Sequence, residues 1–355
     1  MKRNRFYFFF PQSCYGARMN SPKNSQENIV RVPHDAVGLR LDKWLRAKFP
    51  TVPYTAWARF CRKGNVRLDG KRVTGAERLE PGQSVRIPPP DILKKAMVTV
   101  ESLKLLPLSP QAKAQLESWI IYQDDDILCL NKPVGLSVQG GTKTVTHVDG
   151  LLSRWALEKE FTPKLVHRID RDTSGILLVA KTDKAARDLG KSFKTHQIQK
   201  YYVAITAGVP MPWTGTIDAS LEKGMKGNKE KMRVSDEGLR AITHYQVLER
   251  LSTKIAVLGL SPVSGRTHQL RVHLEHIGTP ILGDPKYGGD QQDFSDYQTL
   301  HLHSCITIVP RLGQKPLVLQ AEFPPHFQKT CKDFGFSLPA LMQELKQFIE
   351  IQTSR

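Results

Sequence analysis

Residues 166–175 read Val166-His167-Arg168-Ile169-Asp170-Arg171-Asp172-Thr173-Ser174-Gly175, and the apolar run Ile176–Ala180 follows directly. The apolar run predicts a buried strand, with two carboxylates, two arginines and a histidine at its mouth. Cationic neighbours favour the ionised form of a carboxyl group. An isolated Asp, with a pKa of about 3.9, is already ionised at neutral pH and needs positioning more than activation. A simple turn, in which Asp172 binds backbone amides and Arg168 pairs with Asp170, fits these residues equally well.

Apolar runs on both sides of this stretch predict a large domain over residues 118–355. The expected strands are Ile127–Leu130, Gly175–Ala180, Tyr201–Ile205 and Ile255–Leu260, and the expected helices include Lys184–Lys194 and Gln269–Ile277. Strands and helices do not alternate in strict β-α-β units. The sequence therefore predicts an α+β fold with a mostly antiparallel mixed sheet.

A second, smaller module is predicted over residues 31–88. Leu41, Trp44, Leu45 and Phe49 recur at helical spacing, and Trp57, Phe60 and Cys61 repeat the period before Gly64 ends the second helix. A short strand then runs into the turn at Asp69-Gly70, and another follows Pro81-Gly82. Two helices and a small sheet are expected here.

The segments outside these two domains are expected to lack a core of their own. The proline run Pro88–Pro90 favours extended backbone, and residues 89–117, which begin within it, are predicted to be an interdomain linker. Residues 1–30 hold five Lys or Arg and one acidic residue, and we expect a flexible basic tail. An organelle transit peptide and an upstream extension before Met19 also fit this composition.

The charge of the chain indicates the class of its partner. The 355 residues hold 52 Lys or Arg against 34 Asp or Glu, a net charge of +18. Residues 31–90 carry +8 of this total, from thirteen basic and five acidic residues. Such a concentration indicates a polyanion such as RNA, because neutralising phosphates releases counterions. A solvated surface without a ligand is the alternative.

Two other classes of protein are excluded by composition. No apolar run approaches the roughly 18 residues that span a bilayer, so no membrane partner is expected. Five scattered cysteines without a CxxC pair argue against a disulfide scaffold and against a cysteine zinc site, and indicate a reducing compartment. The acidic run Asp124–Asp126 lacks the spaced ligands of a calcium loop. No metal site is therefore expected.

Three motifs of the larger domain resemble those of the RluA-type pseudouridine synthases. The stretch HRIDRDTSG around Asp170 is similar to the family's active-site motif, HRLDxxTSG. Residues 200–204, KYYVA, resemble its K-x-Y-x-A element, and residues 264–273, SGRTHQLRVH, resemble its GRTHQ-hydrophobic-R motif. Asn131-Lys132-Pro133 precedes them and Gly278–Asp284 follows, in family order, so the resemblance covers residues 122–305. Neighbouring segments are most similar to the RluC type.

The smaller module resembles an S4 RNA-binding domain in "RLDKWL", "ARFCRKGNVRLDGKRV" and "LEPGQSVRIP". In S4 domains the second helix and the loop after it face RNA. The resemblance therefore implies phosphate contacts from six basic residues: Arg59, Arg62, Lys63, Arg67, Lys71 and Arg72.

The family resemblance also assigns roles in the larger domain. It implies that Asp170 is the catalytic aspartate, that Arg271 orients it through a bidentate contact, and that Tyr202 stacks on uracil and, if its pKa is perturbed, removes a proton. The other motif residues expected to contact the RNA are His167, Arg168, Arg171 and Arg266. Pseudouridylation changes neither the composition nor the redox state of the nucleoside, so no cofactor and no metal are expected.

The resemblance implies an enzyme that isomerises uridines of large-subunit ribosomal RNA. The cysteines predict a cytoplasmic location. No motif determines the oligomeric state, and a monomer is the expectation. A synthase acting on transfer RNA or mitochondrial RNA, in the mitochondrial matrix, is one alternative. A non-catalytic RNA-binding ribosome-assembly factor is the other. The basic segment Lys223–Arg233 is expected to grip RNA or to be a solvated loop.

Overall fold

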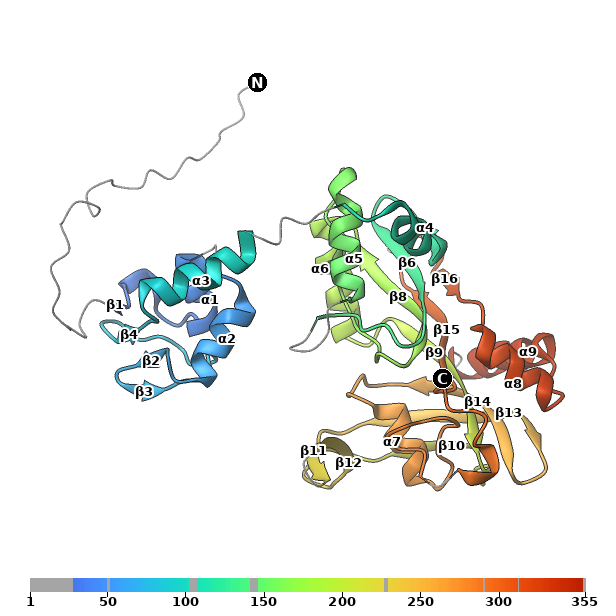
Figure 1. The fold of residues 1–355 in the computed structure, drawn as a ribbon. Helices are drawn as coiled ribbons and strands as arrows, with labels where there is room; N and C mark the ends of the chain where they lie inside the picture. Colours follow the sequence, from blue (N-terminus) through green and yellow to red (C-terminus); the bar gives the residue numbers. More distant parts are fainter. Residues whose placement is uncertain are drawn as a thin grey trace, which may run out of the picture. The chain divides into compact units, whose positions relative to one another are not determined.

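The computed structural model shown in Figure 1 describes residues 28–49, 52–101, 107–140, 146–226, 229–289, 291–311 and 313–353. The chain divides into two compact units, Met1–Lys104 and Leu105–Arg355. Residues 1–27 of the expected basic tail lie outside the described residues. Of the helices in the described ranges, none is long and apolar enough to cross a membrane.

The first unit packs helices on a small antiparallel sheet of order β1-β4-β2-β3. Its strands are β1 (Ile29–Arg31), β2 (Arg67–Leu68), β3 (Lys71–Arg72) and β4 (Ser84–Arg86). Its helices are α1 (Leu41–Lys48), α2 (Tyr54–Arg62) and α3 (Pro90–Glu101), with a 3-10 turn at His34–Ala36. The core buries Leu41, Trp44 and Leu45 of α1 against Trp57 and Phe60 of α2, so both predicted helices are confirmed.

The expected extended linker over residues 89–117 is wrong. Residues from Pro90 form α3, whose Leu93 and Ala96 are buried in the core of the first unit. Residues from Pro110 form α4 (Pro110–Ser118), whose Leu116 is buried in the second unit. Both prolines stand at the first position of a helix, where the missing N–H costs nothing. A proline run therefore began a helix here instead of extending the backbone.

The second unit contains a ten-stranded sheet whose main path is β10-β13-β14-β9-β15-β8-β6-β5, with β16 beside β15 and β7 beside β8. The pairing of β15 with β8 is parallel, and the others are antiparallel, as the sequence predicted. The strands are β5 (Ile120–Gln123), β6 (Ile127–Lys132), β7 (Lys164–Leu165), β8 (Ser174–Ala180), β9 (Gln199–Ala207), β10 (Thr214–Asp218), β13 (Ile242–Leu251), β14 (Ile255–Pro262), β15 (Leu302–Val309) and β16 (Leu317–Gln320). A separate hairpin pairs β11 (Leu221–Lys226) with β12 (Lys229–Val234).

Helices cover both faces of this sheet. Besides α4 they are α5 (Val148–Trp155), α6 (Asp183–Lys194), α7 (Gln269–His276), α8 (Pro325–Asp333) and α9 (Leu338–Thr353), with 3-10 turns at Ala156–Glu158 and Gln292–Phe294. Figure 1 shows α8 and α9 beside β13 and β14, and α7 near the β11–β12 hairpin. Successive side chains of a strand point to opposite faces. On β9, Tyr201 therefore packs with α8 and α9, whereas Tyr202 lies on the face of α7.

Strand β15 brings the two distant catalytic motifs together. His303 pairs with Ser174 of β8 on one side and with Val203 of β9 on the other. Ser304 likewise pairs with Gly175 and with Tyr202. The end of the Asp170 motif and the K-x-Y-x-A element thus share one neighbouring strand, although they are far apart in sequence.

Buried histidines make the second unit sensitive to acid. His303 is fully buried, with Nδ1 2.9 Å from Ser174 Oγ, and burial lowers its pKa to about 4. Burial also lowers the pKa of His301 to about 4 and that of His167 to about 3. These groups stay neutral in the folded state and bind protons once unfolded, so stability falls as the pH drops from about 6.5 toward 4.

We therefore expect His301 and His303, which are fully buried, each to cost on the order of 2 kcal/mol of stability at pH 5 relative to pH 7.5. Denaturant unfolding measured across this range checks the value. Replacing the titrating ring in the His303→Gln variant should make the dependence on pH shallower. An unchanged dependence in that variant would contradict the assignment.

Candidate active site

The Asp170 side chain is carried by the loop between β7 and β8, four residues before β8 begins at Ser174. The end of this loop is tightly held, because Gly175 has φ +104° and a Cβ built on it would lie 2.2 Å from the carbonyl oxygen of Ser304. A side chain at this position would push β8 and β15 apart. The Thr-Ser-Gly end of the motif thus fixes the loop that presents Asp170.

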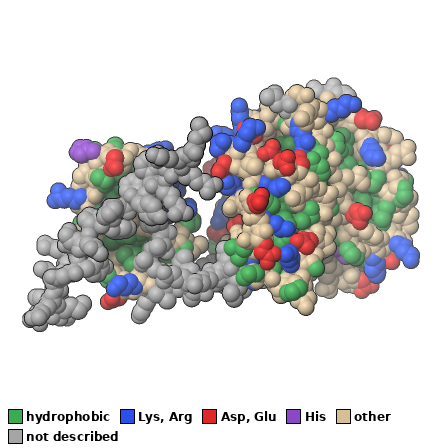
Figure 2. Space-filling model, turned by 90° about the horizontal axis from the view of Figure 1, so that it is seen from above, with side chains coloured by type: hydrophobic (Ala, Val, Ile, Leu, Met, Phe, Trp, Pro, Cys, Tyr) green, Lys and Arg blue, Asp and Glu red, His purple; other side chains and the backbone are tan. Residues whose placement is uncertain are grey.

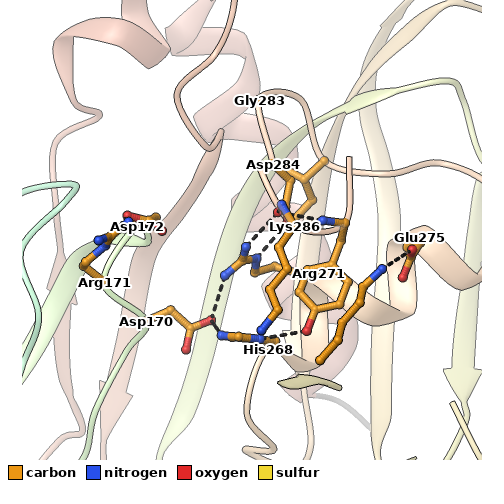
Figure 3. Close-up of polar contacts among 12 residues, drawn as sticks. Asp170, Arg171, Asp172, His268, Arg271, Glu275, Gly283, Asp284 and Lys286 are labelled. Carbon is orange, nitrogen blue, oxygen red and sulfur yellow. Dashed lines mark hydrogen bonds and ion pairs between the residues drawn. The ribbon is translucent and has the colours of Figure 1, made fainter. Parts of the chain in front are cut away.

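Arg271 lies between two carboxylates, as Figure 3 shows. Its Nε and Nη2 each donate a hydrogen bond of 2.7 Å to the buried Asp284, whereas Nη1 faces Asp170 Oδ2 at 3.7 Å. The bidentate contact expected with Asp170 is therefore wrong, because Asp284 occupies that side of the guanidinium. Arg271 is held by Asp284 and directs its remaining nitrogen toward Asp170. The pKa of Arg271 is raised, because the hydrogen bonds and charges of Asp284 and the charge of Asp170 outweigh the burial that opposes them.

A second group faces the same carboxylate oxygen. His268 Nε2 lies 3.9 Å from Asp170 Oδ2, and His268 Nδ1 lies 2.8 Å from the hydroxyl of Tyr287. The Asp170 side chain keeps 21% of its exposure. Asp170 is thus oriented by Arg271 and His268 while remaining open to a ligand.

The other charged residues of the motif do not surround Asp170 as the sequence suggested. Arg171 donates to Asp172 Oδ1 at 2.9 Å, and Figure 3 shows this pair apart from the Asp170–Arg271 contact. Arg168 is exposed. Of the arginines that the structure describes, only Arg271 lies within ion-pair distance of Asp170. Arg168 is therefore available to a ligand or to solvent, whereas Arg171 already has Asp172 as a partner.

His167 differs most from its expected role as an RNA contact. Its Nε2 accepts a hydrogen bond of 2.7 Å from the Leu178 amide, and its ring stacks on Phe193 with 4.5 Å between centroids. Burial lowers its pKa to about 3, so the ring is neutral at physiological pH. His167 therefore lines a cavity of the site as a neutral ring and does not contribute a positive charge for RNA.

Two cavities meet at Asp170. The larger, about 490 Å³, is lined by Asp170, Tyr202, Lys200, Arg266 and Leu270 among others. The smaller, about 370 Å³, is lined by Asp170, Arg168, Arg171 and residues 137–140. The larger cavity combines a flat aromatic ring with apolar and cationic groups, which suits a nucleobase. The smaller cavity offers arginines and exposed backbone, which suits phosphate or ribose.

The basic residues expected to contact RNA in the first unit are also located. Arg59, Arg62 and Lys63 are exposed at the end of α2, and Lys71 and Arg72 are exposed on β3. Arg67 is half-buried, because its guanidinium donates to the carbonyl oxygens of Gly64 and Gly70. Five of the six residues are therefore accessible, while Arg67 stabilises the turn after α2.

Comparison with known proteins places this arrangement in a family. Residues 126–276 match the model of the RNA pseudouridylate synthase family. The ribosomal large subunit pseudouridine synthase C of Vibrio vulnificus is 39% identical over 314 residues, which cover 87% of this chain and 97% of that protein. The chain belongs to the RNA pseudouridine synthases. The sequence resemblance to the RluA and RluC types is thereby confirmed.

Other relatives of this pseudouridine synthase agree. The synthase C of Rickettsia bellii is 33% identical over 307 residues, covering 85% of this chain and all of that protein. The solved structure of human RNA pseudouridylate synthase domain containing 4 matches with a TM-score of 0.52 and 29% identity. It covers 66% of this chain and 97% of that structure.

Tyr202 of this synthase is better suited to stacking on a nucleobase than to acting as a base that is already deprotonated. It lines the larger cavity on the face of α7 and hydrogen-bonds Ser304. Burial and the charge of Asp170 raise its pKa to about 12, against the effect of Ser304. A perturbation in this direction keeps the phenol protonated, so a resting phenolate is not available at neutral pH.

Lys132 is a residue whose role the sequence did not reveal. Its side chain is fully buried, and its Nζ donates to the carbonyl oxygens of Pro133, Leu136 and Arg171 at 2.8, 2.9 and 3.0 Å. Burial lowers its pKa to about 7, although Asp172 and Asp170 oppose this. Lys132 therefore ties the Asp170 loop to residues 133–136, which lead to the wall of the smaller cavity.

Asp284 and Tyr287 were also missed as site residues. Both follow the last motif, in the segment Gly283–Tyr287, which places them against α7. Their position shortly after the arginine motif is the one sequence signal for a role in the site. The sequence does not show which residues of this turn contact which residues of α7. Among the described residues, no group of three or more His, Cys, Asp or Glu side chains is placed to hold a metal ion.

Proposed function

We propose that this synthase converts uridine to pseudouridine in large-subunit ribosomal RNA. The observation that carries the proposal is the Asp170 carboxylate, held by Arg271 where two cavities meet. The substrate class is supported by the relatives from Vibrio and Rickettsia, whose names specify the ribosomal large subunit. Those relatives are matched over 97% and 100% of their length.

The reaction exchanges one bond for another. The N1–C1′ bond of uridine breaks, the uracil turns while bound, and C5 joins C1′. The proton on C5 is lost and N1 gains one, so no atom is added overall. Asp170 is the group that engages the target nucleotide, and Arg271 orients its carboxylate.

The target base must leave the RNA stack before it can reach Asp170. Flipping a nucleotide costs a few kcal/mol, which stacking and phosphate contacts offset. We infer that uracil enters the larger cavity against Tyr202, with Lys200 and Arg266 at the wall. The exposed Arg168, together with Arg171, is then placed for the ribose–phosphate backbone in the smaller cavity.

We also infer that the first unit docks RNA in the manner of an S4 domain. Arg72, Arg67 and Arg86 are direct cross-strand partners on β3, β2 and β4, so three like charges share one face of the sheet. Like charges directly opposite one another are destabilising, and a phosphate would offset the repulsion. Figure 2 shows acidic side chains among the Lys and Arg side chains on the visible face of the second unit, and a few on that of the first unit.

Replacing two exposed members of this row should reduce the dependence of RNA affinity on salt. For Arg72→Gln with Arg86→Gln we expect the slope of log affinity against log salt to fall by about 1 to 2. Filter binding at several salt concentrations measures it. Lys184→Gln on the exposed face of α6 is the control and should leave the slope unchanged. An unchanged slope in the double variant would contradict RNA docking by this row.

We place the enzyme in the cytoplasm of a bacterium, because the ribosomal relatives matched over nearly their whole length are bacterial. The comparisons give no support to a mitochondrial protein. The monomeric state stays a prediction.

The purified protein and three RNA substrates test the substrate class. Transcripts of large-subunit RNA, small-subunit RNA and a transfer RNA pool are incubated with the enzyme, and pseudouridines are located by carbodiimide labelling and reverse transcription. We expect new pseudouridines in the large-subunit transcript. Modification confined to transfer RNA would overturn the proposed substrate and favour the transfer-RNA alternative.

A further inference from the structure

Tyr287 links the β11–β12 hairpin to His268. The backbone N–H of Met232 on β12 donates to the Tyr287 hydroxyl oxygen at 3.1 Å, and the same hydroxyl lies 2.8 Å from His268 Nδ1. Burial raises the pKa of Tyr287 to about 12, so its own proton stays in place. Among the described residues, His268 Nδ1 is the acceptor within reach of that proton.

These contacts determine which nitrogen of His268 carries its proton. If Nδ1 were protonated, it would donate to Tyr287 and leave the buried phenolic proton without an acceptor, which is costly. It would also turn the lone pair of Nε2 toward the Asp170 carboxylate. With the proton on Nε2, both conflicts disappear: Tyr287 donates to Nδ1, and the Nε2–H faces Asp170 Oδ2.

The two oxygens of Asp170 therefore stand in different surroundings. Arg271 Nη1 and His268 Nε2 both face Oδ2, at 3.7 and 3.9 Å. Figure 3 shows the other carboxylate oxygen, Oδ1, on the side of Asp170 that points away from both groups. We propose that His268, with its tautomer fixed by Tyr287, is a positioning residue that together with Arg271 holds Oδ2 and presents Oδ1 to the target nucleotide.

The backbone of His268 is consistent with this role. His268 has φ +55°, in the left-handed region, at the N-cap of α7, and its side chain makes no capping hydrogen bond. Such a conformation is uncommon for a residue with a side chain and is strained. The ring is instead engaged by Tyr287, edge to face with 5.5 Å between centroids. The His268 side chain therefore contacts the site through Tyr287 and does not cap α7.

His268 is a neutral group whose Nε2–H points at Asp170 Oδ2 from 3.9 Å, a contact longer than a hydrogen bond. Its pKa is lowered, first by burial and then by the positive charges of Arg271 and Lys286, while Asp170 and Asp284 oppose the shift. Arg271 therefore supplies the positive charge beside Asp170, and His268 helps to fix the orientation of the Asp170 carboxylate. This division follows from the two different partners that hold these groups, Asp284 and Tyr287.

Three variants test the inference, which rests on the proposed synthase function. His268→Gln keeps an N–H near the position of Nε2, whereas His268→Asn places its amide near Nδ1. Tyr287→Phe removes the acceptor of Met232 and the donor to Nδ1 without changing the ring. Tyr297→Phe, which removes an exposed hydroxyl 3.3 Å from Asp333, is the matched control.

We expect Tyr287→Phe and His268→Asn to lower kcat by about 10-fold to 100-fold with RNA affinity within twofold of wild type. His268→Gln should stay within about fivefold of wild type, and Tyr297→Phe should be unchanged. Equal losses in the Gln and Asn variants would overturn the proposal. Thermal unfolding of each variant separates a loss of folding from a loss of positioning.

A readout independent of turnover comes from ¹⁵N spectra of histidine-labelled full-length protein, with His268→Gln providing the assignment. The wild type should show His268 protonated on Nε2, and Tyr287→Phe should change that pattern. Protonation on Nδ1 in the wild type would overturn the inference even if the enzyme is active. Conversely, the expected tautomer in a protein without synthase activity would contradict the proposed function alone.

Discussion

Asp170→Asn should lose pseudouridine formation by a factor of about 10⁴ or more while binding RNA as tightly as wild type. The amide is nearly isosteric, so the fold and both cavities stay in place. It removes the negative charge that Arg271 faces at 3.7 Å and replaces the reactive carboxylate with a neutral amide, whose remaining oxygen is a poor nucleophile. We expect kcat to fall and RNA affinity to stay the same, because one partly buried carboxylate contributes little to the binding of a long RNA.

Tritium release from RNA labelled at uridine C5 measures this prediction, because C5 loses its hydrogen when it joins C1′. Filter binding on the same RNA gives the affinity. Asp172→Asn is the matched control within the motif, since Asp172 pairs with Arg171 and not with Arg271. We expect it to retain turnover within about tenfold. Normal turnover in Asp170→Asn would exclude Asp170 as the catalytic group.

Asp284→Asn should both destabilise the second unit and reduce turnover. Arg271 and Asp284 are 3% and 6% exposed, and two hydrogen bonds of 2.7 Å join them. Removing one charge of a buried pair leaves the other uncompensated and costs about 3 to 5 kcal/mol. The freed guanidinium would then move toward Asp170 or solvent, so the orientation of the catalytic carboxylate is lost as well.

Denaturant unfolding and tritium release on the same preparation measure both effects. The control is Asp218→Asn, which breaks a bidentate Arg–Asp pair with Arg240 that is exposed to solvent. Surface pairs of this geometry contribute little, so the control should keep both stability and turnover. Equal stability of Asp284→Asn and wild type would show that Asp284 does not hold Arg271.

The motif positions were predictable, but their partners were not. Local motifs predict Asp170, Tyr202 and Arg271 as site residues. Strand β15 brings the Asp170 motif and the strand of Tyr202 together, and α7 carries Arg271 to Asp170. The prediction that Asp170 is the bidentate partner of Arg271 is wrong, because sequence motifs do not show which carboxylate packs against the guanidinium. Asp284 lies thirteen residues later in a turn, and only packing of that turn on α7 reveals the contact.

The secondary structure shows the same division between local and distant information. Helices α1 and α2 followed from apolar spacing, and strand β8 followed from a continuous apolar run. Helices α3 and α4 lie where the sequence predicts a linker. Pro90 and Pro110 each begin a helix with buried apolar residues instead of extending the backbone. The neutral state of His167 could not be predicted either, since it depends on burial against Phe193.

The most direct test of the central claim is a map of pseudouridines in large-subunit ribosomal RNA from the organism's cells lacking this protein. The same cells are complemented with wild type or with Asp170→Asn. We predict that specific pseudouridines disappear without the protein, return with wild type and stay absent with Asp170→Asn. A map unchanged by loss of the protein, or restored by Asp170→Asn, would contradict the account.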